Sequence, residues 1–142
     1  MSQTNILFPC FVMVGITVAV WVRLYFERVG EMRARRIRPQ DISTARQVTE
    51  KLQNVNAADN FRNLFEVPVL FYALCCLALA SQAVTPVLVV GAWVFVVLRA
   101  LHSIIHCTYN RVMHRFAVYV LSTLILFAMW VEFGVSILRV ST

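Results

Sequence analysis

Residues 67–98 read VPVLFYALCCLALASQAVTPVLVVGAWVFVVL and contain no charged side chain. As a single helix this stretch would be roughly 48 Å long, whereas the hydrocarbon core of a bilayer is about 30 Å thick. The chain is therefore expected to fold back on itself. The segment from Ser81 to Pro86 interrupts the apolar run with polar residues and a proline, so it predicts a tight turn between two membrane spans.

Two further apolar runs flank this hairpin. The run from Ile6 to Val22 is uncharged, and the run from Phe116 to Leu138 contains only Glu132 among acidic and basic residues. Backbone polar groups inside hydrocarbon need internal partners, which favours helices packed in a bundle. The sequence therefore predicts an all-α membrane protein, a single four-transmembrane-helix domain over residues 1–142 with spans at about residues 6–26, 63–81, 86–107 and 115–138.

The composition agrees with this interpretation. The chain is 60% hydrophobic and 14% charged, with a mean hydropathy of +0.72, so lipid must solvate much of it. The net charge of +6 is concentrated rather than spread along the chain. One segment between apolar runs holds seven of the basic residues, namely Arg28, Arg33, Arg35, Arg36, Arg38, Arg46 and Lys51. This placement is typical of a loop beside anionic headgroups and argues against a nucleic-acid partner.

The basic residues also predict the orientation in the bilayer. The first loop and the third, which carries Arg111 and Arg115, are basic, whereas the hairpin turn and residues 1–5 are uncharged. Basic loops face the cytoplasm in multi-pass proteins. We therefore expect both loops on the cytoplasmic side and both termini on the opposite side.

Several ionisable residues lie inside the predicted spans, where they are costly and usually face a bundle interior or a subunit interface. Counted from the hairpin turn, Glu66 lies roughly 26 Å down the second span, and Arg99, His102 and His106 lie roughly 22 to 33 Å along the third. Arg115 opens the fourth span. These groups converge on the cytoplasmic leaflet, which predicts a polar site there.

Helical spacing predicts that each span presents these groups on one face. The three sets are Arg62, Asn63 and Glu66 on the second span, Arg99, His102 and His106 on the third, and Arg115 with Tyr119 on the fourth. The arginines outnumber the one embedded carboxylate, and this excess favours an anionic ligand.

Two other interpretations of the same residues stay open at this point. In the first interpretation, Arg99 and Glu66 form an interhelical ion pair that serves helix packing alone. In the second, His102 and His106, at i and i+4, hold a zinc or iron ion together with Glu66. The neighbouring Arg99 and Arg115 disfavour a divalent cation, so no metal ligand is predicted.

The segments NFRNLFEVPVLFY (Asn60 to Tyr72) and RALHSIIHCTYNRVMHRFAVY (Arg99 to Tyr119) resemble the MAPEG superfamily, the membrane-associated proteins of eicosanoid and glutathione metabolism. The specific features are Asn-x-x-Glu on the second span and an arginine on the third span sixteen residues before another at the start of the fourth. Chain length, four spans and a basic first loop also match.

The resemblance implies a homotrimer that binds glutathione as co-substrate at its subunit interfaces, on the cytoplasmic side of a bacterial inner membrane. It implies a transferase or peroxidase that activates the glutathione thiolate for attack on lipophilic small molecules dissolved in the bilayer. Arg115 matches the family's thiolate-stabilising arginine and is the expected catalytic residue. The expected glutathione contacts are Arg62, Asn63, Glu66, Arg99, His102, His106 and Tyr119.

Two positions depart from the family pattern. Family synthases often carry tyrosine where this chain has His106, and they commonly have an arginine where it has Asp59. An acid at that position weakens the expected hold on the carboxylates of glutathione. The superfamily also contains a non-catalytic lipid-binding member, so a lipid-binding or scaffold protein is the alternative interpretation.

Overall fold

The computed structural model describes residues 2–140, and these contain helices and connecting turns but no β-strand. The main helices are α1 (Leu7–Ala34), α4 (Val67–Ala80), α5 (Pro86–Cys107) and α6 (Val112–Val140). Shorter elements are η1 (Gln3–Ile6), η2 (Pro39–Ile42), α2 (Ala45–Lys51) and α3 (Asn56–Asn63). Within the described residues, four helical segments are long and apolar enough to cross a membrane. This confirms the predicted all-helical, multi-pass membrane fold.

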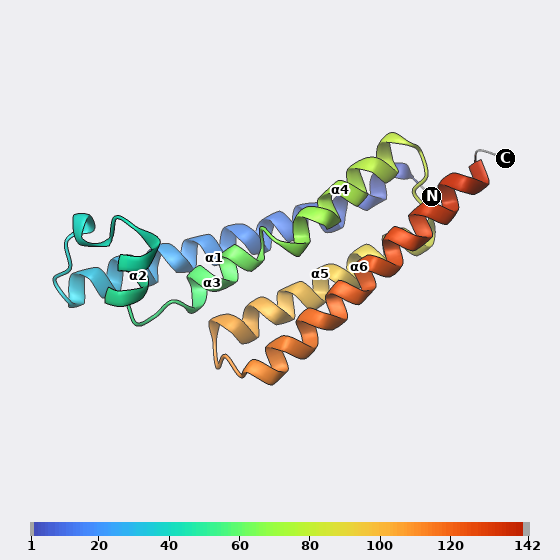
Figure 1. Ribbon diagram of the computed structural model, residues 1–142. Coiled ribbons are helices and arrows are strands. Elements are labelled where there is room, and N and C mark those ends of the chain that lie inside the picture. Colours follow the sequence, from blue (N-terminus) through green and yellow to red (C-terminus); the bar gives the residue numbers. More distant parts are fainter. Residues whose placement is uncertain (1, 141–142) are drawn as a thin grey trace.

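The helices form two pairs that run along the same long axis (Figure 1). Helix α1 lies beside α3 and α4, and α5 packs along α6. The start of α1, the turn between α4 and α5, and the end of α6 gather at one end of the molecule. The α2 region extends past the other end of the bundle. The two ends are therefore chemically different, because only one of them carries the basic segment.

The predicted turn between the second and third spans is confirmed. Helix α4 ends at Ala80 and α5 begins at Pro86, whose missing backbone N–H suits the first turn of a helix. The Thr85 hydroxyl caps α5 by accepting the Leu88 N–H at 3.2 Å. The N–H of Val84 donates to the Gln3 side chain at 3.0 Å and ties the turn to the start of the chain.

Apolar side chains fill the space between the helix pairs. Phe71 of α4 stacks on Phe95 of α5 with ring centroids 4.7 Å apart, and both are fully buried. Gly91 allows α5 and α6 to approach closely, because a Cβ at this position would lie 2.7 Å from the Met129 Cγ. The outer faces remain apolar, as exposed residues such as Phe11 and Leu138 show, and suit lipid or another subunit.

The second span is not one continuous helix. Helix α3 ends at Asn63 and α4 begins at Val67, with a turn between them. Pro68 explains the break, because its ring would clash with the carbonyl of Leu64 and it has no N–H for a helical hydrogen bond. The expectation that Arg62, Asn63 and Glu66 share one helical face is therefore wrong.

The basic segment folds back onto the end of α1. The Glu31 carboxylate accepts the backbone N–H groups of Gln53 at 2.7 Å and Asn54 at 3.2 Å. Arg35 donates to the same carboxylate at 3.0 Å and to the Lys51 carbonyl. These contacts fix the position of the end of the basic segment relative to α1. Helix α3 begins two residues after Asn54, so its start is fixed as well.

Candidate functional site

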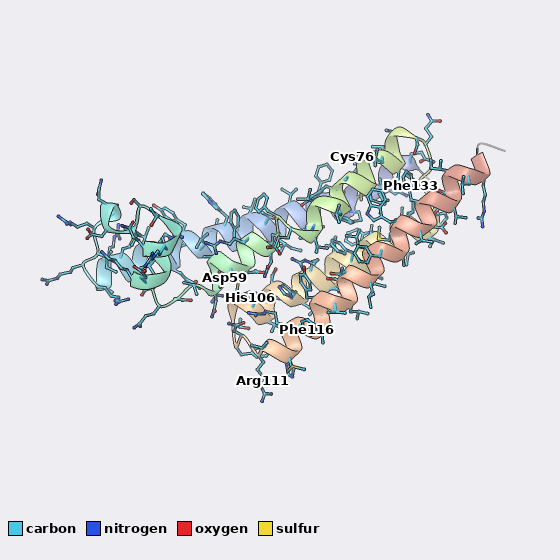
Figure 2. The ribbon with its side chains drawn as sticks, viewed as in Figure 1. Asp59, Cys76, His106, Arg111, Phe116 and Phe133 are labelled. Atoms are coloured by element: carbon cyan, nitrogen blue, oxygen red, sulfur yellow. The ribbon has the colours of Figure 1, made fainter. Side chains whose placement is uncertain are left out.

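The polar residues of α5 and α6 meet near the connection between these helices, at the end of the bundle that carries the basic segment (Figure 2). A cleft of about 190 Å³ opens here. It is lined by Asn63, His102, Val112, Arg115, Phe116 and Tyr119. The structure thus brings together four of the eight predicted site residues, from three different helices.

Arg115 lies in the first turn of α6 and is half-buried. One terminal nitrogen of its guanidinium, Nη1, donates to the Asn110 Oδ1 at 2.7 Å and lies 3.2 Å from the His106 Nε2. A guanidinium cannot accept a hydrogen bond, so Nε2 is the acceptor and carries no proton. His106 is 2% exposed and does not line the cleft. It therefore contacts Arg115 on the side that faces away from the cleft.

His102 is held by the backbone of the same arginine. Its Nδ1 lies 3.2 Å from the Arg115 carbonyl oxygen, which only accepts, so Nδ1 donates. The other ring nitrogen, Nε2, is buried without a hydrogen-bond partner in the described part of the chain. The imidazole packs against Tyr119, with ring centroids 5.7 Å apart. His102 thus joins α5 to the first two turns of α6.

Arg99 is fully buried, at 0% exposure. Its Nη2 donates to the carbonyl of Asn63 at 2.9 Å, and its guanidinium carbon lies 5.4 Å from the centre of the Tyr119 ring. The Nε and Nη1 atoms have no hydrogen-bond partner among residues 2–140. Buried donors without acceptors are costly, and the cost is larger when the group is charged. The unpaired donors therefore favour an anion as an additional ligand.

The stripe of Arg99, His102 and His106 on one face of α5 is confirmed, since all three are buried. Arg62 and Glu66 lie elsewhere. The Arg62 side chain is 61% exposed and pairs with Asp59 at 3.6 Å, and Glu66 is exposed in the turn between α3 and α4. No ion pair joins Glu66 to Arg99 in the described residues. The side chains of Arg62 and Glu66 do not line the cleft.

Sequence reasoning missed a second set of contacts around the site. Asn110 connects Arg115 to Asn56 of α3, with its Nδ2 donating to the Asn56 Oδ1 at 2.8 Å. Asn110 has a φ of 44°, a left-handed conformation for which asparagine is favoured after glycine. An asparagine between two helices signals such a turn, whereas its partner in space, fifty-four residues away, cannot be inferred from spacing.

A buried polar cluster lies on another side of α5. The Asn60 Nδ2 donates to the Cys107 Sγ at 3.4 Å, and the Ser103 hydroxyl donates to the Asn60 Oδ1 at 3.4 Å. These contacts satisfy the fully buried Asn60 amide and hold α3 against α5. Their spacing, with Ser103 and Cys107 at i and i+4, is the signal that would have found them.

The cleft is cationic. Arg115 lines it, Arg99 lies behind Tyr119, and none of the residues that line it is acidic. Within residues 2–140, no group of three or more histidine, cysteine, aspartate or glutamate side chains is placed to hold a metal ion. The ring nitrogens that contact Arg115 are engaged in hydrogen bonds. The arrangement suits a negatively charged small molecule with an ionisable group near the Arg115 guanidinium.

These features define a multi-pass, all-helical membrane protein with a cationic cleft at one end of its bundle. The MAPEG family model matches residues 6–135, and the chain belongs to this family. The family includes membrane glutathione transferases and related enzymes as well as non-enzymatic members. No curated protein and no solved structure matches the chain significantly.

Proposed function

We propose that this protein is a membrane-bound, glutathione-dependent transferase or peroxidase that acts on lipophilic electrophiles. The observation that supports this most is the Arg115 guanidinium, which lines the cleft with one nitrogen held by the protein. Its remaining N–H donors suit the sulfur of glutathione. A nearby cation stabilises a thiolate and lowers the pKa of the thiol.

The chemistry follows from that contact. The thiol proton leaves to solvent, and the thiolate attacks the electrophilic atom while the leaving group departs with its bonding electrons. With a hydroperoxide, the thiolate attacks the terminal oxygen, the O–O bond breaks, and the alkoxide leaves and takes a proton from solvent to become the alcohol. A second glutathione thiolate then attacks the sulfur of the resulting sulfenic acid, and water leaves as the disulfide forms. Exposed apolar faces on every span give electrophiles dissolved in the bilayer direct access to the protein.

The proposal includes a homotrimer with glutathione at the subunit interfaces. The cleft of about 190 Å³ is smaller than the roughly 300 to 1,000 Å³ of typical ligand pockets, so one subunit encloses only part of a tripeptide. Arg62 and Glu66 are exposed on the other helix pair and lie outside this cleft. In a trimer they are available to the cleft of a neighbouring subunit.

Thermal denaturation of the detergent-purified protein tests the proposed function. A ligand that binds only the folded state at 100 times its dissociation constant stabilises that state by about 2.7 kcal/mol. We expect millimolar glutathione to raise the melting temperature and zinc to leave it unchanged. If glutathione has no effect at concentrations that saturate known thiol-binding enzymes, the proposed function is wrong.

The orientation is also part of the proposal, since the site and the basic segment share one end of the bundle. We expect a C-terminal alkaline phosphatase fusion, which is active only outside the cytoplasm, to be active in a bacterial inner membrane. The same reporter inserted after Gln40, in the basic segment, should be inactive. The reverse pattern would place the site on the outer side, where glutathione is scarce.

A specific observation favours one alternative, a non-enzymatic lipid-binding or scaffold protein. Apolar grooves of about 300 Å³ between α1 and α5 and about 450 Å³ between α5 and α6 are larger than the polar cleft. Their linings are almost entirely apolar and suit acyl chains. Under this alternative a fatty acid would raise the melting temperature, whereas glutathione would not.

A further inference from the structure

Asn110 is the residue in the connection between α5 and α6 that makes side-chain contacts in two directions. Its Oδ1 accepts from the Arg115 Nη1 at 2.7 Å, and its Nδ2 donates to the Asn56 Oδ1 at 2.8 Å. The backbone is fixed as well, because its N–H donates to the Ile105 carbonyl at 2.9 Å. Reversing the amide would turn its NH₂ toward the guanidinium, donor against donor, so its orientation is determined.

Asn56 connects this contact to the rest of the molecule. It is the first residue of α3, two residues after the segment that Glu31 of α1 holds through the Gln53 and Asn54 N–H groups. A continuous series of hydrogen bonds and short chain segments therefore runs from the end of α1, through the start of α3, to Asn110 and then to Arg115. The position of the guanidinium depends on three other helices.

The two acceptors take only one nitrogen of the guanidinium. Asn110 and His106 both contact Nη1, and no protein group in residues 2–140 accepts from Nε or Nη2. Arginine side chains lose about 2 kcal/mol of rotamer entropy when they are fixed in one conformation. With Nη1 held, most of that entropy is lost before a ligand binds, and the remaining donors keep a defined direction relative to the cleft.

Both acceptors are also neutral. An amide oxygen and an unprotonated imidazole nitrogen orient the guanidinium without cancelling its charge, whereas a carboxylate in either place would form an ion pair. This matters for a residue whose role is to stabilise a developing anion, because the charge must remain available to the ligand.

We propose that Asn110 is a positioning residue that, supported by Asn56, holds Arg115 in the orientation that stabilises the thiolate while leaving its charge uncompensated. The inference rests on the proposed function. It assigns to the connection between α5 and α6 a direct part in setting the reactivity of the bound thiol.

Three variants test the inference. Asn110→Gly removes the side chain but tolerates the left-handed backbone, and Asn110→Asp keeps an acceptor but adds a negative charge. Gln82→Gly is the matched control, because Gln82 also has a left-handed φ, of 55°, but is exposed in the turn at the other end of the molecule. The measurements are the ultraviolet absorbance of the thiolate of bound glutathione as a function of pH, and the glutathione dissociation constant.

We expect the pH midpoint of thiolate formation to rise by about one pH unit or more in Asn110→Gly and Asn110→Asp, which is about a tenfold loss of thiolate at neutral pH. The dissociation constant should change less than about threefold, because the other contacts remain. Gln82→Gly should match the wild type. Loss of folding alone would lower the amount of bound glutathione without moving the midpoint of the fraction that binds.

Asn56 provides a second route that does not alter the α5–α6 connection. Asn56→Ala should raise the midpoint in the same direction by a smaller amount, and Asn56→Asp, which keeps the acceptor for Nδ2, should restore it. A wild-type midpoint in Asn110→Gly and Asn56→Ala, alongside a raised midpoint in Arg115→Leu, would overturn the role of Asn110 and leave the proposed function intact. An unshifted midpoint in the wild type would overturn both.

Discussion

Arg115→Leu is expected to bind glutathione with nearly wild-type affinity but to turn over a generic electrophile at least about tenfold more slowly. The substitution removes the cation that lines the cleft, and it leaves Asn63, His102 and Tyr119 in place. A free thiol has a pKa of about 8.5, and a neighbouring guanidinium in a partly desolvated cleft lowers this pKa by about one to three pH units. Without that charge, only a few per cent of the bound thiol is ionised at neutral pH.

The pH dependence separates this role from a structural one. Because the cation stabilises the thiolate, the wild type should keep its activity down to lower pH than Arg115→Leu, and the two rates should converge above the pKa of the free thiol. Arg115→Lys should recover part of the activity, since it keeps the charge but loses the planar fork. Arg111→Leu, an exposed arginine four residues earlier that does not line the cleft, is the control. Equal pH profiles in wild type and Arg115→Leu would show that Arg115 only anchors α6.

The fold was largely predictable because the physics that determines it is local. A charge-free run too long for one crossing must turn, and the polar residues and Pro86 offer one place to do so. The start of α5 at Pro86 follows from the same residue. Long uncharged runs in lipid favour helices, which satisfy their own backbone hydrogen bonds, so length and hydropathy are sufficient to predict the architecture without any knowledge of contacts.

The part of the site on α5 and α6 was predictable for a similar reason. Both helices are continuous through the polar residues, so spacing correctly placed Arg99, His102 and His106 on one face and Arg115 one turn before Tyr119. Spacing could not show which of them lines the cleft. His106 contacts the side of Arg115 that faces away from the cleft, and the Tyr119 ring lies over the Arg99 guanidinium.

The second span was harder because its periodicity is interrupted. Pro68 breaks the helix between Asn63 and Val67, so the three-residue spacing of Asn63 and Glu66 no longer fixes their relative direction. The contact between Asn56 and Asn110 joins residues far apart in the sequence, so no periodic pattern in the sequence predicts it. Any side chains that a neighbouring subunit contributes would also be invisible in the pattern of a single chain.

Arg99 is a buried cation with few partners. Its side chain is 0% exposed, yet two of its nitrogens have no acceptor within residues 2–140. Replacing a buried ion pair by apolar side chains of similar volume is often neutral or stabilising, by about 1 to 4 kcal/mol, because the desolvation cost of the charges is removed, and a buried charge without an ion-pair partner carries the same kind of cost. Arg99→Met should therefore unfold at the same temperature as the ligand-free wild type or higher. Asn63 is only half-buried, so water can replace the donor that its carbonyl loses.

The same substitution should weaken glutathione binding at least about tenfold, or about 1.4 kcal/mol, because it removes two unpaired donors that are available to a carboxylate in addition to the Arg115 donors at the cleft. A carboxylate can reach the Arg99 donors only if the Tyr119 ring turns aside from the guanidinium. This movement involves the ring and not the hydroxyl, so Tyr119→Phe should bind glutathione nearly as well as the wild type. Calorimetric titration and thermal denaturation of the same Arg99→Met sample measure both effects. A gain in stability with a loss of affinity identifies a residue retained for its ligand. A loss of several kcal/mol of stability with unchanged affinity would instead show that Arg99 holds α5 against α3 through the Asn63 carbonyl.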